Sequence, residues 1–215
     1  MLTNNLFERV LVAPTARGAD ALLIVSGYAS PAMARTHFER IPARIRIHLL
    51  VGMTSLEGIQ RVFHESFQRL AGQDFRGRFE CRYVSTLPAV HSKTYVWLKR
   101  NKPFVAFIGS ANYSQEAFFR RRELLAPDTP TNIARYYRSL RQDSVDCLDA
   151  AVKDRIRLTE FERKQSLYPP RRQPKLRIAP QPNRPANAAS VLIPLLTQAG
   201  EVGRRSGLNW GQRPE

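Results

Sequence analysis

The chain has 215 residues, of which 34 are lysine or arginine and 18 are aspartate or glutamate, so its net charge is +16. This length can bury one full hydrophobic core and leave some chain for a linker or a second unit. So strong a basic excess favours a polyanionic partner, nucleic acid first and an anionic membrane second, over a basic protein that has no such partner.

Cysteines, histidines and hydropathy exclude several classes of protein. Cys81 and Cys147 are too few for a disulfide framework and lack metal-ligand spacing, which suits a reducing cytoplasm. The four histidines form no HxxxH-type pair, so we expect no zinc site, and no cofactor is predicted. Glu8 and Arg9 interrupt the apolar residues of the N-terminus, which therefore lacks a signal-peptide core. Because no apolar run is long enough to cross a bilayer, we expect a soluble, cytoplasmic protein without a membrane partner.

Three stretches in the first half of the chain show apolar residues at helical spacing. The first covers the N-terminus and is expected to end at Pro14. The second covers residues 31–40, with Ser30 as its N-cap. The third forms one apolar stripe from Ser55 to Gly72, so it predicts a single helix that faces the core.

Three short apolar runs alternate with these helices and predict strands, at residues 21–26, 44–51 and 79–85. Ligands of open α/β sheets bind beyond the carboxyl ends of strands, so Ser26 and Tyr28 are candidates to line a site. A capping serine and a tyrosine at the edge of the core explain them equally well. His48, within the second run, is expected to be a core or edge residue rather than a catalytic one.

Two further strand-like runs, 94–98 and 104–108, are joined by a polar turn and predict a β-hairpin. Polar residues flank its open end in pairs whose i, i+2 spacing places them on one face of a strand, His91 with Lys93 and Ser110 with Asn112. Antiparallel pairing brings both pairs to the same end of the hairpin.

After the hairpin, residues 114–119 could form one helical turn, and 123–126 a short strand that starts at Glu123. This acidic residue follows three arginines, a setting in which a carboxylate is usually just a solvated charge. Apolar residues at helical spacing then predict one long helix from Thr129 to about Leu158, packed on its own domain or on a second subunit.

The composition changes from Arg163 onward. Residues 163–215 contain eight of the fifteen prolines and ten lysines and arginines against two glutamates. We expect 163–190 to be a Pro-rich basic linker, either a disordered arm that adds nonspecific DNA affinity or an ordered wrap. Apolar residues return in 191–215, which look like the beginning of a folded unit or a tail.

The side chains at the open end of the hairpin suit chemistry on a phosphodiester. An imidazole can act as nucleophile or proton donor, while an ammonium, a hydroxyl and a carboxamide can neutralise the non-bridging oxygens. Gly109 has no side chain, so a ligand could approach the backbone there. No metal ion is needed for this chemistry. The alternative interpretation is an ordinary hairpin with polar ends, because His-x-Lys alone is a common pair.

Two short motifs connect the chain with a known family. His91-Ser92-Lys93 and Gly109-Ser110-Ala111-Asn112 resemble the HxK…GSxN signature of the phospholipase D superfamily. Glu123 stands where nucleases of that superfamily often carry an acidic residue. Leu98 replaces the aspartate usually found five residues after the lysine, and this departure is similar to the restriction-endonuclease branch of the NgoFVII type. The resemblance spans roughly residues 1–160.

The resemblance implies a phospholipase D-like catalytic domain over residues 1–162. Its fold would be an α/β sandwich with a mixed β-sheet flanked by helices, which agrees with the predicted order of elements. In NgoFVII-type enzymes a segment similar to 191–215 leads into a B3-like DNA-recognition domain. The resemblance therefore implies that this segment begins an incomplete C-terminal domain of that kind, unless it is only a tail.

The resemblance also implies a mechanism. The superfamily's reaction uses two histidines, one that attacks phosphorus and one that protonates the leaving oxygen. This chain carries the motif once, so we expect a homodimer with the active site at the subunit interface. The expected activity is metal-independent hydrolysis of double-stranded DNA through a phosphohistidine intermediate, as in a type II restriction endonuclease. The expected catalytic residues are His91, Lys93, Ser110, Asn112 and Glu123.

Two other functions stay open at this point. The first is a phospholipase D-like lipid phosphodiesterase, against which Leu98 and the lack of apolar membrane-binding segments count. The second is a non-catalytic DNA-binding module of the same fold. A nuclease and such a module would both bind DNA with a steep salt dependence, so the basic charge favours neither.

Overall fold

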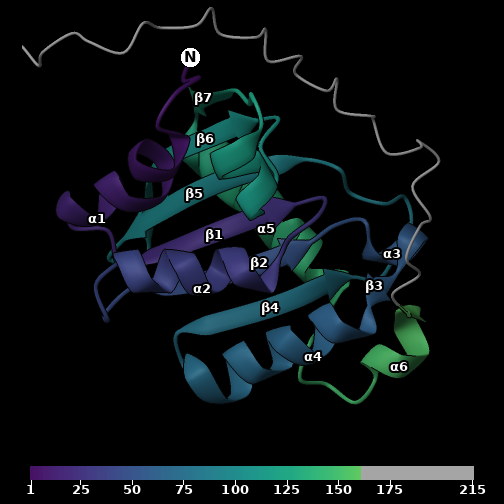
Figure 1. Cartoon of the computed structure of the whole chain (residues 1–215). Helices are drawn as coiled ribbons and strands as arrows, with labels where there is room; N and C mark the ends of the chain where they lie inside the picture. Colours follow the sequence, from purple (N-terminus) through teal and green to yellow (C-terminus); the bar gives the residue numbers. More distant parts are fainter. Residues whose placement is uncertain (161–215) are drawn as a thin grey trace, which may run out of the picture. The chain divides into compact units, whose positions relative to one another are not determined.

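The computed structural model describes residues 1–160 and contains a mixed seven-stranded sheet with helices on both faces (Figure 1). In sheet order the strands are β7 (Leu125–Asp128), β6 (Lys102–Gly109), β5 (Lys93–Lys99), β1 (Ala21–Ser26), β2 (Arg46–Val51), β4 (Phe79–Val84) and β8 (Ser144–Asp146). The pairs β1–β2 and β2–β4 are parallel, and the others are antiparallel. The expected α/β sandwich with a mixed sheet is confirmed.

Helical segments connect these strands and cover both faces of the sheet. They are η1 (Phe7–Val12), α1 (Ala13–Ala16), α2 (Pro31–Arg40), α3 (Thr54–Glu57), α4 (Arg61–Arg69), η2 (Leu70–Asp74), η3 (Glu116–Arg120), α5 (Pro130–Gln142) and α6 (Val152–Arg155), where η marks a π-helical turn. A second, two-stranded parallel sheet consists of β3 (Ile59–Gln60) and β9 (Leu158–Thr159). Figure 1 shows α2 and α4 on one face of the large sheet and α5 on the other.

Several elements begin and end where the sequence predicts. The strand at 21–26 is β1, and all six of its residues are buried because helices cover both sides of the sheet. The strand expected at 44–51 begins two residues later, as β2. The helix at 31–40 is α2, and the Ser30 hydroxyl accepts a hydrogen bond from the Met33 amide at 3.3 Å, as an N-cap does.

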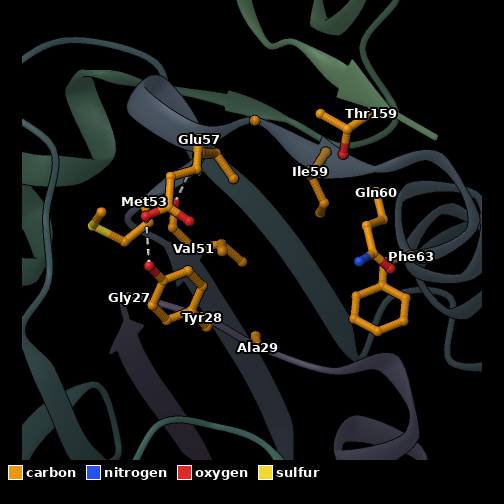
Figure 2. A pocket seen from close by; sticks show the side chains of 12 residues that line it. Gly27, Tyr28, Ala29, Val51, Met53, Glu57, Ile59, Gln60, Phe63 and Thr159 are labelled. Carbon is orange, nitrogen blue, oxygen red and sulfur yellow. Dashed lines mark hydrogen bonds between the residues drawn. The ribbon is translucent and has the colours of Figure 1, made fainter. Parts of the chain in front are cut away.

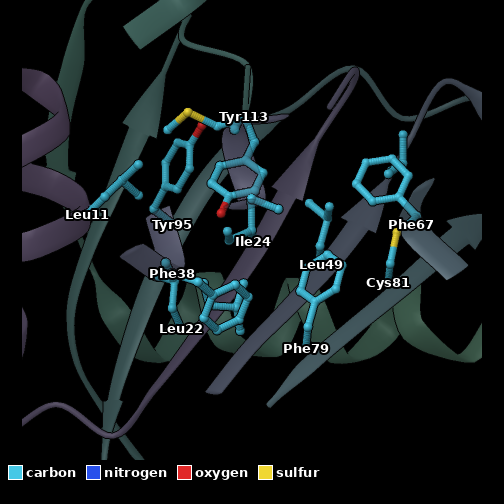
Figure 3. Close-up of a cluster of buried hydrophobic side chains, with 14 of the residues drawn as sticks. Leu11, Leu22, Ile24, Phe38, Leu49, Phe67, Phe79, Cys81, Tyr95 and Tyr113 are labelled. Atoms are coloured by element: carbon cyan, nitrogen blue, oxygen red, sulfur yellow. The ribbon is translucent and has the colours of Figure 1, made fainter. Parts of the chain in front are cut away.

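The main hydrophobic core contains buried side chains of the sheet and of α2 and α4. Figure 3 shows part of this cluster, including Leu22 and Ile24 of β1 and Phe38 of α2. Leu22, Ile24 and Leu49 reach it from β1 and β2 and are fully buried. The ring of Phe38 on α2 stacks on Phe75 with centroids 4.1 Å apart. Fully burying one such aliphatic or aromatic side chain contributes about 1.5–3 kcal/mol to the free energy of unfolding. These contacts therefore hold α2 against the sheet. A smaller core lies beneath α5.

Pro14 does not end the N-terminal helix, contrary to the prediction. The chain stays helical from η1 into α1, and Pro14 falls in the first turn of α1, where a missing N–H costs least. A proline also leaves the carbonyl four residues earlier without its helical donor. Here that carbonyl belongs to Val10, and it accepts a hydrogen bond from the indole Nε1 of Trp97 at 2.7 Å.

The single helix predicted from Ser55 to Gly72 is wrong. The structure divides this stretch into α3, β3 and α4, and Gly72 lies inside η2. The break falls at Gly58, whose φ is +79° and where a Cβ would lie 2.2 Å from the Arg157 carbonyl oxygen. This close approach allows β3 to pair with β9, and it leaves Leu56 of the predicted apolar stripe exposed.

The long helix predicted from Thr129 to Leu158 is also wrong, because α5 ends at Gln142. The chain then forms β8, which pairs with the outer edge of β4 with Val145 opposite Tyr83. The backbone groups at the edge of β4 need partners, and a strand supplies them where a helix would not. The side chain of Val145 is buried on β8, as it was expected to be on the helix, so apolar spacing could not distinguish the two.

The linker expected at 163–190 and the segment 191–215 lie outside the described residues. Within residues 1–160, every helix is too short or too polar to cross a membrane.

Candidate active site

The predicted hairpin is confirmed as β5 and β6, which pair in antiparallel register with Thr94 opposite Ile108. The connection is tighter than expected, because Arg100 and Asn101 form a two-residue turn with positive φ angles of 50° and 63°. At the open end Lys93 also pairs with Ser26, the last residue of β1. Three strand ends therefore meet where the polar residues were expected.

His91 and Lys93 lie against each other at this end. The Lys93 ammonium is 3.0 Å from Nδ1 and 3.1 Å from Nε2 of His91, and it donates to the His91 carbonyl oxygen at 2.6 Å. His91 is exposed, whereas Lys93 is buried. Burial lowers the pKa of Lys93, and the negative charge of Glu123 acts in the opposite direction. An exposed imidazole is thus held beside a partly desolvated cation.

Asn112 is oriented by the end of β1 through its carbonyl oxygen. Oδ1 accepts from the Tyr28 amide at 3.1 Å and lies 3.3 Å from the Ser26 hydroxyl. Ser26 is fully buried, and its hydroxyl also donates to the Tyr28 carbonyl and accepts from the Tyr113 amide at 2.9 Å. These contacts fix the carboxamide and leave its Nδ2 donors without a protein partner within residues 1–160. They are the donors that an anion could use.

Gly27 brings His91 and Asn112 together, and the sequence interpretation missed it. A Cβ at this position would lie 2.8 Å from Cδ2 of His91 and 3.5 Å from Oδ1 of Asn112. Only glycine therefore lets the imidazole pack against the backbone at the end of β1. A glycine directly after a fully buried strand was the available signal.

Tyr28 also contacts His91. Its ring meets the imidazole edge to face, with centroids 5.7 Å apart. Its hydroxyl donates to Oε1 of Glu57 at 2.7 Å (Figure 2). This hydrogen bond is the main cause that raises the pKa of Tyr28, followed by burial. Of the two interpretations left open for Ser26 and Tyr28, the structure therefore favours the one in which both lie at the site.

Ser110 and Glu123 form a separate pair at the edge of the site. The Ser110 hydroxyl donates to the Glu123 carboxylate and accepts from the Leu124 amide at 3.1 Å. Glu123 therefore holds Ser110 directly and acts on Lys93 only through its charge. It precedes β7 by two residues rather than starting that strand.

Gly109 and Leu98 have local structural roles. A Cβ on Gly109 would lie 2.1 Å from the Leu124 carbonyl oxygen. The missing side chain therefore makes room for the backbone of the adjacent segment at Leu124, whereas the sequence predicted room for a ligand. Leu98 lies near the far end of β5, where its carbonyl accepts from the Asp20 amide at 3.0 Å. The position that distinguishes this chain from the usual superfamily motif is thus remote from His91 along the strand.

Exposed arginines lie next to Glu123 in sequence. Arg120 pairs with Glu116 at 2.9 Å, whereas Arg121 and Arg122 make no ion pair within residues 1–160. They give the surface beside Ser110 a positive charge that a polyanion could meet.

The other three histidines are held elsewhere. His37 is fully buried between the Tyr113 hydroxyl and the Leu11 carbonyl, and burial lowers its pKa to about 4. His64 bonds to the Tyr83 hydroxyl at 3.1 Å, and burial likewise lowers its pKa. In the part of the chain that the structure describes, no three His, Cys, Asp or Glu side chains gather where they could bind a metal ion.

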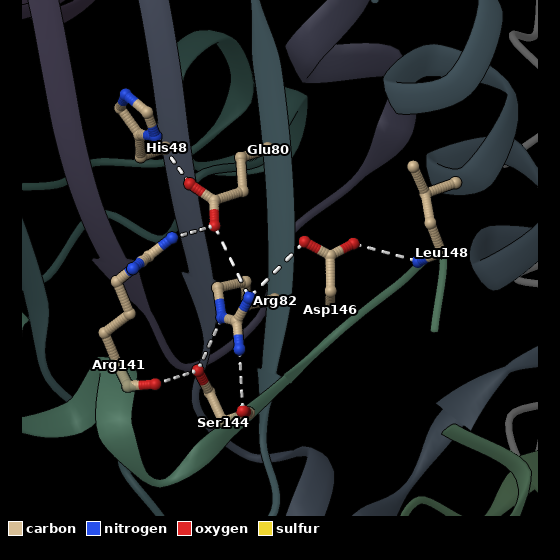
Figure 4. Close-up of polar contacts among 7 residues, drawn as sticks. All are labelled: His48, Glu80, Arg82, Arg141, Ser144, Asp146 and Leu148. Atoms are coloured by element: carbon tan, nitrogen blue, oxygen red, sulfur yellow. Dashed lines mark hydrogen bonds and ion pairs between the residues drawn. The ribbon is translucent and has the colours of Figure 1, made fainter. Parts of the chain in front are cut away.

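His48 belongs to a cluster of charged side chains beneath α5 (Figure 4). Its Nδ1 lies 2.6 Å from Oε2 of Glu80, and the other oxygen of Glu80 accepts from Arg141 at 2.6 Å. Arg82 reaches Asp146 at 3.4 Å. Burial alone would raise the pKa of Glu80, but the hydrogen bonds from His48 and Arg141 lower it to about 2. His48 is thus a half-buried residue of the central strand β2 that is held by Glu80, away from the site at His91.

Comparisons with solved structures found chains of low identity. NucT from Helicobacter pylori is 15% identical with a TM-score of 0.45, over 67% of this chain and 96% of that one. Nuc from Salmonella typhimurium, a phospholipase D family member, is 16% identical with a TM-score of 0.45, over 64% and 89%. A polyphosphate kinase from Porphyromonas gingivalis gives 16% and 0.45, over 66% of this chain and 21% of the kinase.

The comparison with curated proteins found no match. The comparison with family models matched residues 4–154 to the NgoFVII restriction endonuclease N-terminal PLD domain, where PLD denotes phospholipase D. The match covers most of the chain and contains every residue of the site described above. This chain therefore belongs to the family of NgoFVII restriction endonuclease N-terminal PLD domains.

Proposed function

We propose that the chain is an endonuclease that hydrolyses DNA phosphodiester bonds without a metal ion, through a phosphohistidine intermediate, as a type II restriction endonuclease. Family membership supports the class of reaction. The observation that carries the proposal is the exposed imidazole of His91, which lies 3.0 Å from the Lys93 ammonium near the carboxamide of Asn112. The Asn112 oxygen accepts a hydrogen bond from the Tyr28 amide, so its Nδ2 group is the part available to a ligand. These groups can supply a nucleophile and donors for the non-bridging oxygens of one phosphate.

In the proposed first step, a ring nitrogen of His91 attacks phosphorus and forms a P–N bond. The P–O bond to the leaving group breaks, and a second imidazole protonates the departing oxygen. Water then cleaves the P–N bond, with the second imidazole as general base. Lys93 and the Nδ2 group of Asn112 would stabilise the charge on the phosphate oxygens during both steps. Ser110 and Glu123 would position this end of the hairpin.

The second imidazole has to come from another subunit. The chain has four histidines, and the three besides His91 are held by Tyr113, Glu80 and Tyr83. We therefore propose a homodimer in which a two-fold axis places the partner subunit's His91 opposite this one. The net charge of +16 supports double-stranded DNA as the substrate.

Plasmid cleavage in excess EDTA tests the proposed activity. The wild-type chain should cleave plasmid with the chelator present, and His91→Ala should be inactive. His48→Ala, which removes an imidazole outside the site, is the matched control and should stay active. Loss of wild-type cleavage on chelation would contradict the mechanism. Binding without cleavage by a confirmed dimer would instead favour a DNA-binding module, and lipid release a lipid phosphodiesterase.

A subunit-mixing experiment tests the shared site. Wild-type and His91→Ala chains are refolded together at increasing proportions of the variant. If each site needs both histidines, heterodimers are inactive and cleavage should fall as the square of the wild-type fraction. A linear fall would mean that each chain acts alone and would contradict the dimer.

A further inference from the structure

A pocket of about 250 Å³ opens next to His91, beyond the end of β1. Gly27 and Tyr28 form its wall on the side of the active site, and both also contact His91. The rest of the wall comes from β2, α3, β3, the first turns of α4 and β9. A chemical group bound in this pocket would therefore lie next to a phosphate bound at His91, as neighbouring parts of one substrate molecule do.

Two aromatic rings in the pocket remain accessible. Tyr28 and Phe63 keep 42% and 37% of their surface exposed, although both line the pocket together with apolar residues such as Val51. Figure 2 shows Tyr28 and Glu57 on one side of the pocket and Gln60 and Phe63 on the other. Accessible aromatic rings beside a site for phosphodiesters are a platform on which nucleobases stack, whatever their sequence.

Glu57 gives this pocket a preference among bases. Its Oε1 accepts from the Tyr28 hydroxyl at 2.7 Å, which fixes the carboxylate, while Oε2 has no protein partner within residues 1–160. A carboxylate can only accept hydrogen bonds. The Glu57 carboxylate therefore favours bases that donate from an amino group, such as guanine, cytosine and adenine. It repels the two carbonyl oxygens of thymine, which are also acceptors.

Building on the proposed nuclease activity, we propose that this pocket binds a nucleobase unstacked from the substrate strand next to the scissile phosphate. Glu57 selects a base with an exocyclic amino group over thymine, guanine best because two of its N–H groups face one carboxylate. The base has to leave the duplex stack to enter the pocket, which costs least at unpaired or mismatched positions.

Inhibition by mononucleotides tests the pocket separately from DNA cleavage. In this assay, hydrolysis of bis(p-nitrophenyl) phosphate, a diester without a base, is measured for the chain of residues 1–215 in the presence of dGMP or dTMP. We expect dGMP to inhibit roughly tenfold more strongly than dTMP, the discrimination of one good hydrogen-bonded base contact. Glu57→Gln should remove most of this difference and leave hydrolysis of the chromogenic diester intact.

Two further variants test the aromatic wall. Phe63→Ala should weaken inhibition by both nucleotides, because the stacking surface is lost. Phe119→Ala removes an exposed ring from η3, outside the pocket, and should change neither value.

The outcomes separate this inference from the proposed function. Equal inhibition by dGMP and dTMP, with normal hydrolysis of the chromogenic diester, would overturn the pocket assignment and leave the nuclease intact. A wild-type chain that cleaves neither plasmid nor the diester would overturn both. A change of oligomeric state in Phe63→Ala by light scattering, with unchanged nucleotide inhibition, would assign the pocket to a subunit contact and overturn the inference.

Discussion

His48 lies on β2 and His91 lies two residues before β5 of the same sheet, each beside charged side chains, but their neighbours are arranged differently. His48 meets the carboxylate of Glu80, which is also bound by Arg141, so positive and negative charges in that cluster offset one another. The charged group that His91 contacts is the ammonium of Lys93, and the nearby carboxylate of Glu123 is engaged by Ser110. The charged groups around His48 pair with one another, whereas the site at His91 has positive charge and hydrogen-bond donors that are available to a ligand.

This difference distinguishes a stabilising cluster from a binding site. Groups that satisfy each other in the folded state contribute to the free energy of unfolding. Groups that are fixed by the backbone while their donors stay free are preorganised for an incoming anion and contribute little to stability. The two regions should therefore respond oppositely to mutation, one in stability and the other in activity.

The largest expected effect is the loss of activity in His91→Ala. Without the proposed nucleophile, cleavage should fall by roughly 10⁴-fold or more, while the free energy of unfolding stays unchanged because His91 is exposed. His48→Ala should show the reverse, with normal cleavage and reduced stability. Initial rates on plasmid and urea unfolding curves measure the two effects. Equal losses of activity in both variants would contradict the comparison.

Asn112→Ala should lower cleavage by about 10²–10³-fold, the usual effect of removing one preorganised donor to a transition-state oxyanion. The effect should appear in kcat rather than in DNA affinity. Asn132→Ala on the exposed side of α5 is the matched control and should leave the rate unchanged. An effect on affinity alone would mean that Asn112 only binds the substrate.

Glu80→Gln should lower the free energy of unfolding by about 3 kcal/mol at neutral pH, with activity retained. The folded pKa of Glu80 is about 2 against an ordinary value of 4.5, and its side chain is only 18% exposed. A lowered pKa stabilises the fold above the unfolded value, so this contribution should disappear as the pH falls from 4.5 towards 2. Urea unfolding at several pH values measures it.

The matched control for this loss is Glu39→Gln, which changes an exposed glutamate on α2. It should leave both the stability and its pH dependence unaltered. A Glu80→Gln chain as stable as the wild type would mean that the cluster does not stabilise the fold.

The smallest expected effect is that of Glu123→Gln. It weakens the charge-assisted bond to Ser110 and removes the charge that acts on Lys93, but no group that faces the phosphate. Cleavage should fall by about tenfold, the equivalent of one such hydrogen bond. A loss as large as that of His91→Ala would assign Glu123 a direct role in the reaction.

The sequence predicted the parts of the molecule that depend on near neighbours. The strand at 21–26, the N-cap at Ser30 and the hairpin that carries His91 all follow from local patterns, and their placement is confirmed. The helix breaks at Gly58 and Gln142 depend instead on strands that pair across long separations, which spacing cannot reveal.

The same limit applies to the candidate site. The i, i+2 pairs on the hairpin could be read from the sequence, because antiparallel pairing is local. The hydrogen bond from the Tyr28 amide to Asn112 connects residues 84 positions apart, and Gly27 is likewise distant in sequence from the residues that it contacts. Only the meeting of β1 with β5 brings them together. The proposed catalytic pairs can be read from the sequence, but the contacts that support them depend on the whole sheet.

The hydrogen bond from the Trp97 indole to the Val10 carbonyl has a practical consequence. The indole is fully buried on the strand that begins with Lys93, and it is the sole tryptophan among residues 1–160. In a chain that carries Trp210→Phe, its emission would be a built-in spectroscopic probe of how tightly the N-terminal helix docks on the β5–β6 hairpin. A red shift on denaturation would report the release of that helix without any added label.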